Sequence, residues 1–198
     1  MSTATLRLAR TADAAQIARI YAPLVRDTAT TFEVEAPGSS EMAQRIADTS
    51  LRFAWLVVEQ DDHVRGFAYA CRHRKRAAYQ WSADVSVYVA DHARRSGVGR
   101  GLYTTLLELL AAQGYANAFA GIALPNNASI ALHEAFGFTS VGIYRSVGYK
   151  LGNWWDVGWW QLCLPAIETT PPPPTRLPEL ADGIVSQAVA DGQAQLDG

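Results

Sequence analysis

The sequence predicts an α/β fold in which helices flank a mixed, mostly antiparallel central sheet. Short apolar stretches suited to strands alternate along the chain with stretches of helical period, and such alternation builds sheets covered by helices. Glycines and polar turn residues end several of these stretches. With 198 residues, 49% of them hydrophobic, the chain has the length and the apolar content for the core of one domain.

The first half of the chain is expected to alternate strands and helices. Apolar residues between Ile17 and Val25 fall on one face of a predicted helix, and Ser39 or Ser40 is suited to cap a second helix. The predicted elements are, in order, strand 6–9, helix 13–27, a polar β-branched loop at 28–32, a helix ending at 47, strands 53–59 and 64–72, and strand 82–89.

The second half is expected to begin with a helix over residues 98–112, whose leucines face inward and which Gly114 ends. Gly137 is placed to end the next helix. The remaining predicted elements are strand 116–124, helix 128–136, and strands near 139–144 and 156–164.

A run of four prolines, Pro171 to Pro174, predicts the end of the folded domain, because such a run stays extended. We therefore expect one domain over residues 1–165 and a Pro-rich, acidic tail over residues 166–198. The tail has five acidic residues and one basic residue, and its scattered apolar residues suit at most a short helix. The expectation is a disordered tail that can be removed without loss of activity. Folding of the tail back onto the domain, or docking on a partner, is the alternative.

Composition argues against several classes of function. A formal net charge of −2 indicates neither a nucleic acid nor an anionic membrane as a partner. The sequence has no signal-like N-terminal segment and no apolar run of membrane-spanning length, so a cytoplasmic protein is expected. Cys71 and Cys163 fit neither a metal-binding spacing nor a disulfide framework. No metal is therefore expected.

A glycine-rich turn between a predicted strand and a predicted helix is the most informative motif. The strand ends in Val87-Tyr88-Val89, and the turn reads Arg94-Arg95-Ser96-Gly97-Val98-Gly99-Arg100-Gly101. Such a turn can direct several backbone N–H groups at one point beside the positive end of the helix dipole, which suits a pyrophosphate. The Lys-Ser or Lys-Thr of a Walker loop and the third glycine of the dinucleotide fingerprint are both missing. A helix entry that simply contains glycine is the alternative.

A second motif follows the strand predicted at 116–124. It reads Leu124-Pro125-Asn126-Asn127-Ala128-Ser129 and continues as Leu132-His133-Glu134-Ala135-Phe136-Gly137-Phe138. Asn127 or its neighbour is placed to cap the helix. Alone, this motif describes a plain strand–helix–strand unit, so its weight comes from its position after the glycine-rich turn.

Together the two motifs resemble the GCN5-related N-acetyltransferase (GNAT) superfamily. The segment Gly148-Tyr149-Lys150-Leu151-Gly152-Asn153-Trp154-Trp155-Asp156-Val157-Gly158, with Tyr88-Val89 and Leu132-His133-Glu134, is similar to its phosphinothricin and methionine sulfoximine acetyltransferase branch. The resemblance extends from about Leu6 to Leu164. It implies a sheet whose central strands splay apart, acetyl-CoA as the co-substrate, and a homodimer.

The resemblance implies three groups of contacts to acetyl-CoA. The glycine-rich turn would hold the pyrophosphate through Arg94, Arg95, Ser96, Gly97, Val98 and Gly99. The backbone of Val87, Tyr88 and Val89 would pair with the pantetheine arm and leave an N–H group for the developing oxyanion. Asn126 and Ser129 would contact the cofactor from the second motif.

The resemblance also implies two residues for proton transfer. The amine base of this branch is a glutamate just before the strand, and Asp84 stands at that position. Because aspartate is one methylene shorter, its carboxylate lies about 1.5 Å further back, and a bridging water could restore the reach. His133 stands where many relatives carry a tyrosine that protonates the thiolate, and a histidine can do the same. The alternatives are an aspartate and a helix-surface histidine without a catalytic role.

The acceptor is expected to meet the loop that follows residue 72. The resemblance implies that Arg74, Arg76, Ala78 and Tyr79 grip the acidic groups of an amino-acid substrate, with Phe32 packed against it. The fork of an arginine binds a carboxylate or phosphinate through two hydrogen bonds. A solvated basic turn and a phenylalanine packed on the core are the alternatives.

The predicted function is transfer of the acetyl group of acetyl-CoA to the α-amine of a small acidic amino-acid analogue of the phosphinothricin or methionine sulfoximine type. Acetylation of protein N-termini or of other small amines, and a CoA-binding sensor without turnover, are the alternatives. Trp154, Trp155, Trp159 and Trp160 are expected to help form the homodimer, since aromatic residues are enriched in interface cores. All four could instead pack within one subunit.

Overall fold

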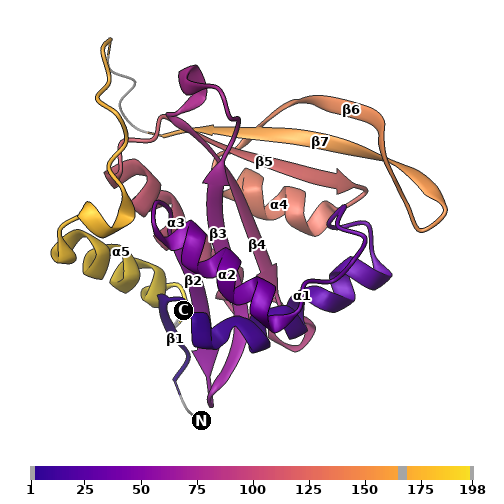
Figure 1. Ribbon diagram of the computed structural model, residues 1–198, viewed down its shortest axis with the longest axis horizontal. Coiled ribbons are helices and arrows are strands. Elements are labelled where there is room, and N and C mark those ends of the chain that lie inside the picture. The colour runs from indigo at the N-terminus through magenta and orange to yellow at the C-terminus, as the bar shows by residue number, and fades with distance from the viewer. Residues whose placement is uncertain (1–2, 165–168, 197–198) are drawn as a thin grey trace.

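A sheet with helices on both faces forms the centre of the molecule (Figure 1). The structure is a computed structural model that describes residues 3–164 and 169–196, and the sheet has seven strands over these residues. The strands are β1 (Thr5–Leu8), β2 (Trp55–Gln60), β3 (His63–Arg72), β4 (Ser82–Val89), β5 (Asn117–Leu124), β6 (Thr139–Lys150) and β7 (Asn153–Cys163). The helices are α1 (Ala14–Asp27), α2 (Ser39–Ser50), α3 (Val98–Ala112), α4 (Asn127–Ala135) and α5 (Asp182–Ala194). The predicted α/β class is confirmed.

The order of the strands across the sheet is β1-β2-β3-β4-β5-β7-β6. Neighbouring strands are antiparallel except for β4 and β5, which are parallel. These two pair from Ser82 to Asp84 and from Asn117 to Phe119, and then they diverge (Figure 1). The mixed sheet with splayed central strands is therefore as predicted. The split leaves the backbone of residues 85–89 open on the side that faces β5.

Helices α1 and α2 cover one face of the sheet, because each presents an apolar stripe to it. The larger buried side chains on this face are Ile17, Tyr21, Val25, Met42, Ile46, Trp55, Val57 and Phe67. Helix α2 differs in detail from the prediction. Its N-cap is Gly38 rather than a serine, Ser39 is its first helical residue, and it ends at Ser50 rather than at residue 47.

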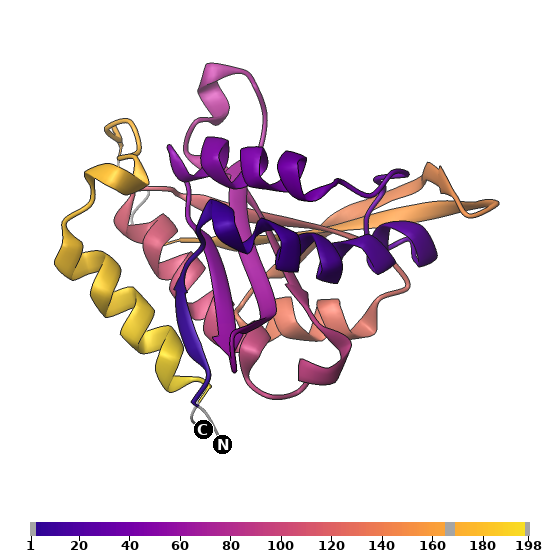
Figure 2. The same cartoon turned by 60° about the horizontal axis from the view of Figure 1, so that its bottom comes forward.

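Helices α3, α4 and α5 lie on the other face (Figure 2). Leu102 and Leu106 of α3 are fully buried in the same core as Ala68, Ala83 and Ala118 of the facing strands. Such small strand residues allow a helix to lie close to the sheet. This packing fixes the N-terminal end of α3 beside the split between β4 and β5.

The C-terminal segment differs most from the sequence prediction. Instead of a disordered tail, residues 182–194 form α5, which packs along α3 and β1 (Figures 1 and 2). The Gln193 side chain accepts the Leu6 N–H at 2.8 Å and donates to the Ala4 carbonyl at 2.7 Å. Thr105 donates to the Ala188 carbonyl at 2.9 Å. The expectation of disorder is wrong for this segment, while the predicted domain boundary between residues 165 and 166 lies outside the described residues.

Strands β6 and β7 form a longer hairpin than predicted, because they include residues 145–150 and 153–155. Leu151 (φ 53°) and Gly152 (φ 77°) have left-handed backbone, as a tight hairpin turn requires. The pairing shifts register between Tyr144 and Gly148. This irregularity interrupts the alternation of side chains, which is why the sequence pattern does not reveal the continuous strands.

The four tryptophans of β7 do not form one cluster, because neighbouring residues of a strand point to opposite faces of the sheet. Trp160 is buried in the core, and Trp159 is half-buried on the opposite face. Trp155 is half-buried, and its indole donates to the Lys150 carbonyl at 2.8 Å. Trp154 is 65% exposed, so it is the one tryptophan of the four that is open to a partner.

Candidate active site

The glycine-rich turn lies at one end of the split, where it leads into α3. Arg95 (φ 64°) and Gly97 (φ 80°) both have left-handed backbone, and Ser96 Oγ donates to the Ala93 carbonyl at 2.7 Å. Gly97 is the N-cap residue of α3, and within the described ranges no side chain caps the helix there. The first N–H groups of a helix carry its positive dipole end. They are available here to an anion.

The turn and the split fit acetyl-CoA. Arg94 and Arg95 are exposed beside the turn, where they suit the phosphates of a polyanionic ligand. The open backbone of residues 85–89 offers donors and acceptors to an extended pantetheine arm. Val98 is buried, which anchors the start of the helix, and Gly99 follows it in the first turn. The structure thus brings the predicted residues of β4 and of the turn to one side of the split.

Asn126 and Ser129 lie beyond the end of β5, at the start of α4. Asn126 is the N-cap residue, and its side-chain oxygen accepts the Ser129 N–H at 3.2 Å. This bond confirms the predicted capping of the helix. The two residues stand on the β5 side of the split, opposite the glycine-rich turn on the β4 side.

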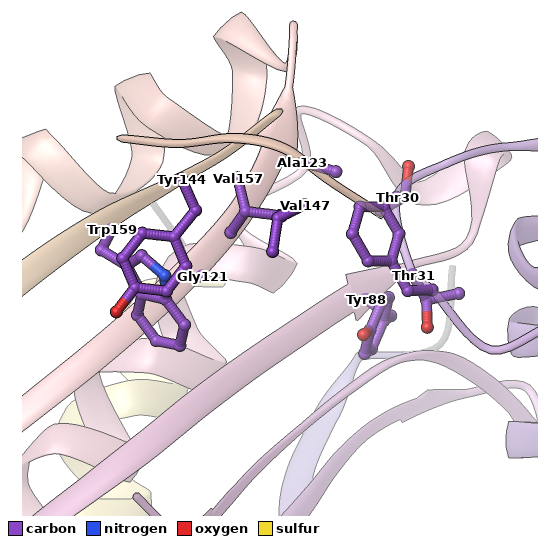
Figure 3. A pocket seen from close by; sticks show the side chains of 10 residues that line it. Thr30, Thr31, Tyr88, Gly121, Ala123, Tyr144, Val147, Val157 and Trp159 are labelled. Atoms are coloured by element: carbon purple, nitrogen blue, oxygen red, sulfur yellow. The ribbon is translucent and has the colours of Figure 1, made fainter. Parts of the chain in front are cut away.

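A cavity of about 370 Å³ lies where the split meets the β6–β7 hairpin (Figure 3). Its walls are mostly apolar and aromatic, as is common in small-molecule sites. It is lined by Thr30, Thr31, Phe32, Tyr88, Gly121, Ala123, Tyr144, Val147, Val157 and Trp159. Phe32 and Tyr88 were expected at the site from the sequence. The volume of the cavity lies within the range of small-molecule sites.

The loop between α1 and α2 is fixed at the cavity by polar contacts from three directions. The Tyr21 hydroxyl lies 2.7 Å from the Thr31 hydroxyl and donates to Glu33 at 2.9 Å. Arg45 donates to both carboxylate oxygens of Glu33, at 2.8 and 2.9 Å. From the hairpin, Lys150 Nζ donates to the Thr31 carbonyl at 2.6 Å. These contacts hold the loop against both the helices and the hairpin.

Asp84 lies just before the split, on the same face of β4 as Tyr88. Its Oδ1 lies 2.5 Å from Nδ1 of His73, a residue that the sequence did not point to. Burial raises the pKa of the Asp84 carboxyl, and the hydrogen bond from His73 opposes that rise. The two side chains meet because the register of β3 and β4 pairs Cys71 with Asp84. This register brings His73, which follows the end of β3, beside the Asp84 carboxylate.

His133, which the sequence suggested as the proton donor to the thiolate, is a buried residue. The ring is only 3% exposed and lies in the core between α3 and α4. Its Nδ1 lies 2.7 Å from the Ser129 carbonyl, so Nδ1 carries the proton, and Nε2 accepts from the Tyr103 hydroxyl at 2.9 Å. Burial lowers the pKa of His133. Both nitrogens thus have partners within the protein, and the role of His133 in proton transfer stays a prediction.

The basic loop after β3 brings two of its four predicted residues to this end of the site. The Arg74 guanidinium lies 5.4 Å from the centre of the Trp159 ring, and Trp159 lines the cavity. The Tyr79 ring meets the His73 ring edge-on at 6.0 Å. Arg76 and Ala78 are exposed in the loop, and neither is among the described residues that line the cavity.

Sequence reasoning missed His73, Trp159 and Tyr144. Trp159 could have been found from the strand register, since it lies on Gly121 of β5, where a Cβ would come within 3.2 Å of the ring. Tyr144 belongs to the irregular part of β6, which no periodicity reveals. Within residues 3–164 and 169–196, no group of three His, Cys, Asp or Glu side chains is placed to hold a metal ion. In the same ranges, no helix is long and apolar enough to cross a membrane.

Several known acetyltransferases are similar to this chain in sequence. The model of the acetyltransferase (GNAT) domain family matches residues 6–159. The chain is 39% identical to a phosphinothricin N-acetyltransferase of Streptomyces viridochromogenes over 86% of this chain and 92% of that protein. It is 33% identical to an L-methionine sulfoximine/L-methionine sulfone acetyltransferase of Salmonella typhimurium over 81% of this chain and 94% of that protein.

Among solved structures, a phosphinothricin acetyltransferase from Sinorhizobium meliloti in complex with acetyl-CoA superposes with a TM-score of 0.82. The two chains are 32% identical, and the match covers 90% of this chain and 98% of that one. Together these matches confirm the family resemblance and the fold that the two sequence motifs predicted.

Proposed function

Because the chain belongs to the GNAT superfamily, in its phosphinothricin and methionine sulfoximine acetyltransferase branch, we propose that it acetylates the α-amine of a small amino-acid analogue with an acidic side group. The chain is an acetyl-CoA-dependent N-acetyltransferase. We therefore do not propose the alternative function, a CoA-binding sensor without turnover. The observation that carries the proposed acceptor is the cavity of about 370 Å³ beside the split. Arg74 is stacked on its wall.

The proposed cofactor site follows the split from the glycine-rich turn to the cavity. Bound acetyl-CoA supplies the acetyl group as a thioester. We assign the pyrophosphate to the N–H groups at the start of α3, with Arg94 and Arg95 beside it. The open backbone of Val87–Val89 would hold the pantetheine arm, and one of its N–H groups would donate to the oxyanion that forms at the carbonyl. Asn126 and Ser129 would close the β5 side.

Asp84 is proposed to serve the removal of a proton from the acceptor amine. An ammonium group has no lone pair, so it must lose a proton before the nitrogen can attack the thioester carbon. Asp84 is a partly exposed carboxylate at the start of the split, on the face of the sheet that holds the cavity. By the family resemblance, Asp84 stands where the branch carries its glutamate base.

Arg74 is proposed to bind the acidic group of the acceptor. Its guanidinium is exposed and is placed by the ring of Trp159 rather than by an ion pair with another described residue. The Arg74→Ala variant should raise KM for the acceptor about tenfold, since a hydrogen bond to a charged group contributes on the order of 1.5–3 kcal/mol. Lys75→Ala is the matched control, because Lys75 is an exposed cation of the same loop.

A panel of acceptors tests the substrate class. Release of CoA would be followed with phosphinothricin, methionine sulfoximine, methionine sulfone, glutamate, a peptide with a free N-terminus and a polyamine. We expect the highest kcat/KM with an acidic amino-acid analogue, and a loss of that preference in Arg74→Ala. A higher kcat/KM for the peptide or the polyamine would show that the proposed acceptor class is wrong.

A second copy of the chain is proposed to cover the outer part of the β6–β7 hairpin. Large apolar side chains are exposed there: Val141, Ile143, Tyr144, Val147, Tyr149, Leu151 and Trp154. β6 is also an edge strand of the sheet, and an apolar edge strand tends to pair with another chain. Sedimentation at micromolar concentration should show a dimer for the wild type and a monomer for Trp154→Glu. Ile184→Glu, at an exposed position of α5, is the control, and a monomeric wild type would refute the dimer.

A further inference from the structure

His73 gives Asp84 a partner that extends the reach of this short acid. The Nδ1–H of His73 donates to the Asp84 carboxylate over 2.5 Å. This bond fixes the tautomer, because the proton on Nδ1 leaves Nε2 with its lone pair. Among the described residues, Nε2 has no hydrogen-bond partner. The basic nitrogen of the ring is therefore on the side away from Asp84.

The ring of His73 is held in a slot between aromatic side chains. It stacks on Phe119 with ring centres 4.3 Å apart and planes 19° apart. The Trp159 ring lies edge-on to the imidazole, with ring centres 6.0 Å apart and planes at 85°. The Tyr79 ring contacts the imidazole from the loop after β3. These contacts leave the imidazole one preferred orientation. Such fixed orientation is expected of a group that must present one nitrogen to a reactant.

The slot lies next to the acceptor cavity. Phe119 pairs with Asp84 across the last joined position of β4 and β5, and Gly121, two residues further on β5, lines the cavity. Trp159 contacts His73 and also lines the cavity. The imidazole is therefore adjacent to the cavity wall at the point where the split opens. Its side chain is 11% exposed and that of Asp84 is 26% exposed, so water reaches both.

We propose that His73 and Asp84 act as a dyad, in which Nε2 of His73 takes the proton of the acceptor amine, directly or through one water, and Asp84 orients the ring. The proposal rests on the acetyl-transfer function and adds the base that it requires. The usual glutamate of this branch reaches the amine by its own length. Here the acid is one methylene shorter. The imidazole that is hydrogen-bonded to it would extend the reach of the site toward the amine.

The proton balance of the dyad is complete. The ammonium loses one N–H proton to Nε2, and the imidazolium that forms is stabilised by the Asp84 carboxylate. The amine lone pair then attacks the carbonyl carbon, so that a C–N bond forms and the C–S bond breaks. His73 returns its proton to the thiolate, and the second proton of the amine leaves to solvent. The products are an amide, a thiol and one proton, with the dyad restored.

The charged and titratable groups that face the dyad are few. Arg74 donates to the His73 carbonyl at 2.7 Å, lies against the Trp159 ring, and favours the ionised form of Asp84. Cys71 is the strand partner of Asp84 on β3. The pKa of its thiol is raised to about 11, mainly by burial and to a smaller extent by the charge of Asp84. Tyr79 faces the ring from the loop. A fall of kcat/KM in acid would therefore report on the dyad rather than on Arg74 or Cys71.

Three variants test the dyad. His73→Asn keeps a side-chain N–H donor for Asp84 but cannot accept a proton, so kcat should fall about 100-fold. His73→Phe keeps the stack on Phe119 but removes both nitrogens, with a similar loss expected. Adding Asp84→Glu to His73→Phe lengthens the acid and should recover at least about tenfold of that loss. Calorimetry should show unchanged affinity for acetyl-CoA in all three, and thermal unfolding shows that they fold.

The pH profile separates catalysis from a structural role. In the wild type kcat/KM should fall toward acid as the dyad is protonated, and this limb should disappear or move in His73→Asn. A folded His73→Asn variant with kcat within about threefold of wild type and the same acid limb would overturn the dyad. If the wild type acetylates none of the acidic analogues but acetylates another amine, the proposed acceptor fails instead. The same comparison of His73→Asn with the wild type is then made with that amine.

Discussion

The two ends of the active-site cleft are held in different ways. At the cofactor end, α5 supports the glycine-rich turn from behind: a Cβ on Gly97 would lie 2.4 Å from the Gln195 carbonyl oxygen, and one on Gly101 would lie 2.7 Å from that of Gly192. At the acceptor end, the β6–β7 hairpin projects from the sheet (Figure 1) and most of its side chains are exposed. One end is closely packed within the chain, and the other presents an uncovered apolar surface.

The difference matches what each end has to bind. A pyrophosphate is held by backbone N–H groups, which must keep fixed positions, so close packing behind the turn lowers the cost of ordering them. The proposed acceptor would meet side chains on a loop and on a two-stranded hairpin, which can vary without disturbing the core. Substitutions at the two ends should therefore change different kinetic constants: KM for acetyl-CoA at one end, and kcat or acceptor KM at the other.

The largest effect is expected for Asp84→Ala, at the acceptor end. Loss of the carboxylate leaves His73 without the group that orients it and stabilises its charged form, so kcat should fall about 100-fold or more. Affinity for acetyl-CoA, measured by calorimetry, should stay unchanged, because Asp84 lies before the split rather than at the turn. An equal loss of cofactor affinity in this variant would show that the two ends are not separable.

The next largest effect is expected at the contact between α5 and α3. A Cβ on Gly192 would lie 2.0 Å from Thr105 Oγ1 and 2.6 Å from the Gly101 carbonyl oxygen, so Gly192→Leu must push α5 away from α3. Exposure of the apolar side chains of α5 should cost on the order of 3 kcal/mol of stability, and the unsupported turn should raise KM for acetyl-CoA about tenfold.

The matched control is Gly183→Leu, since Gly183 lies in the same helix and a Cβ there meets nothing within 4 Å. It should change neither thermal stability nor KM by much. This pair replaces the expectation, drawn from the sequence, that the tail can be removed without consequence. If Gly192→Leu unfolds at the wild-type temperature and keeps its KM, α5 does not support the turn.

A smaller effect is expected for Gly97→Ala, measured against Gly114→Ala. Both glycines have left-handed backbone, at φ +80° and +86°, so each variant should lose about 1–2 kcal/mol of stability from strain. Only Gly97 also has a close neighbour, the Gln195 carbonyl. This carbonyl follows α5 and can shift to make room for the added methyl group. Affinity for acetyl-CoA should therefore fall about fivefold in Gly97→Ala, an effect of about 1 kcal/mol, and not in Gly114→Ala.

The sequence predicted the local structure of the glycine-rich turn and of the α4 cap well, because local chemistry builds both. Glycine at Gly97 allows the left-handed N-cap, and Asn126 caps the next helix through its own side chain. The support behind the turn was not predictable in this way. Gly192 lies close to Gly101 because neither residue has a side chain. A contact of this kind produces no apolar periodicity in the sequence.

The residues around the cavity were predicted only in part, because their positions depend on strand register. His73 meets Asp84 across the ends of β3 and β4, and a shift of one residue would separate them. Trp159 reaches the cavity because the alternation of β7 directs it onto Gly121. The burial of His133 against Tyr103 was likewise not evident from its motif, which suggested only a role in proton transfer.

The smallest effect is expected for Gly148→Ala, where the hairpin meets the loop between α1 and α2. A Cβ on Gly148 would come within 2.1 Å of the Phe32 ring, so the ring has to turn away from the cavity that it lines. Because Phe32 is 38% exposed, it can move at little cost, and stability should change by less than about 0.5 kcal/mol. KM for the acceptor should rise about threefold, with kcat and acetyl-CoA affinity unchanged. Ser140→Ala, at an exposed position of the same strand, is the control. Equal acceptor KM values in Gly148→Ala and the wild type would mean that Phe32 does not contact the acceptor.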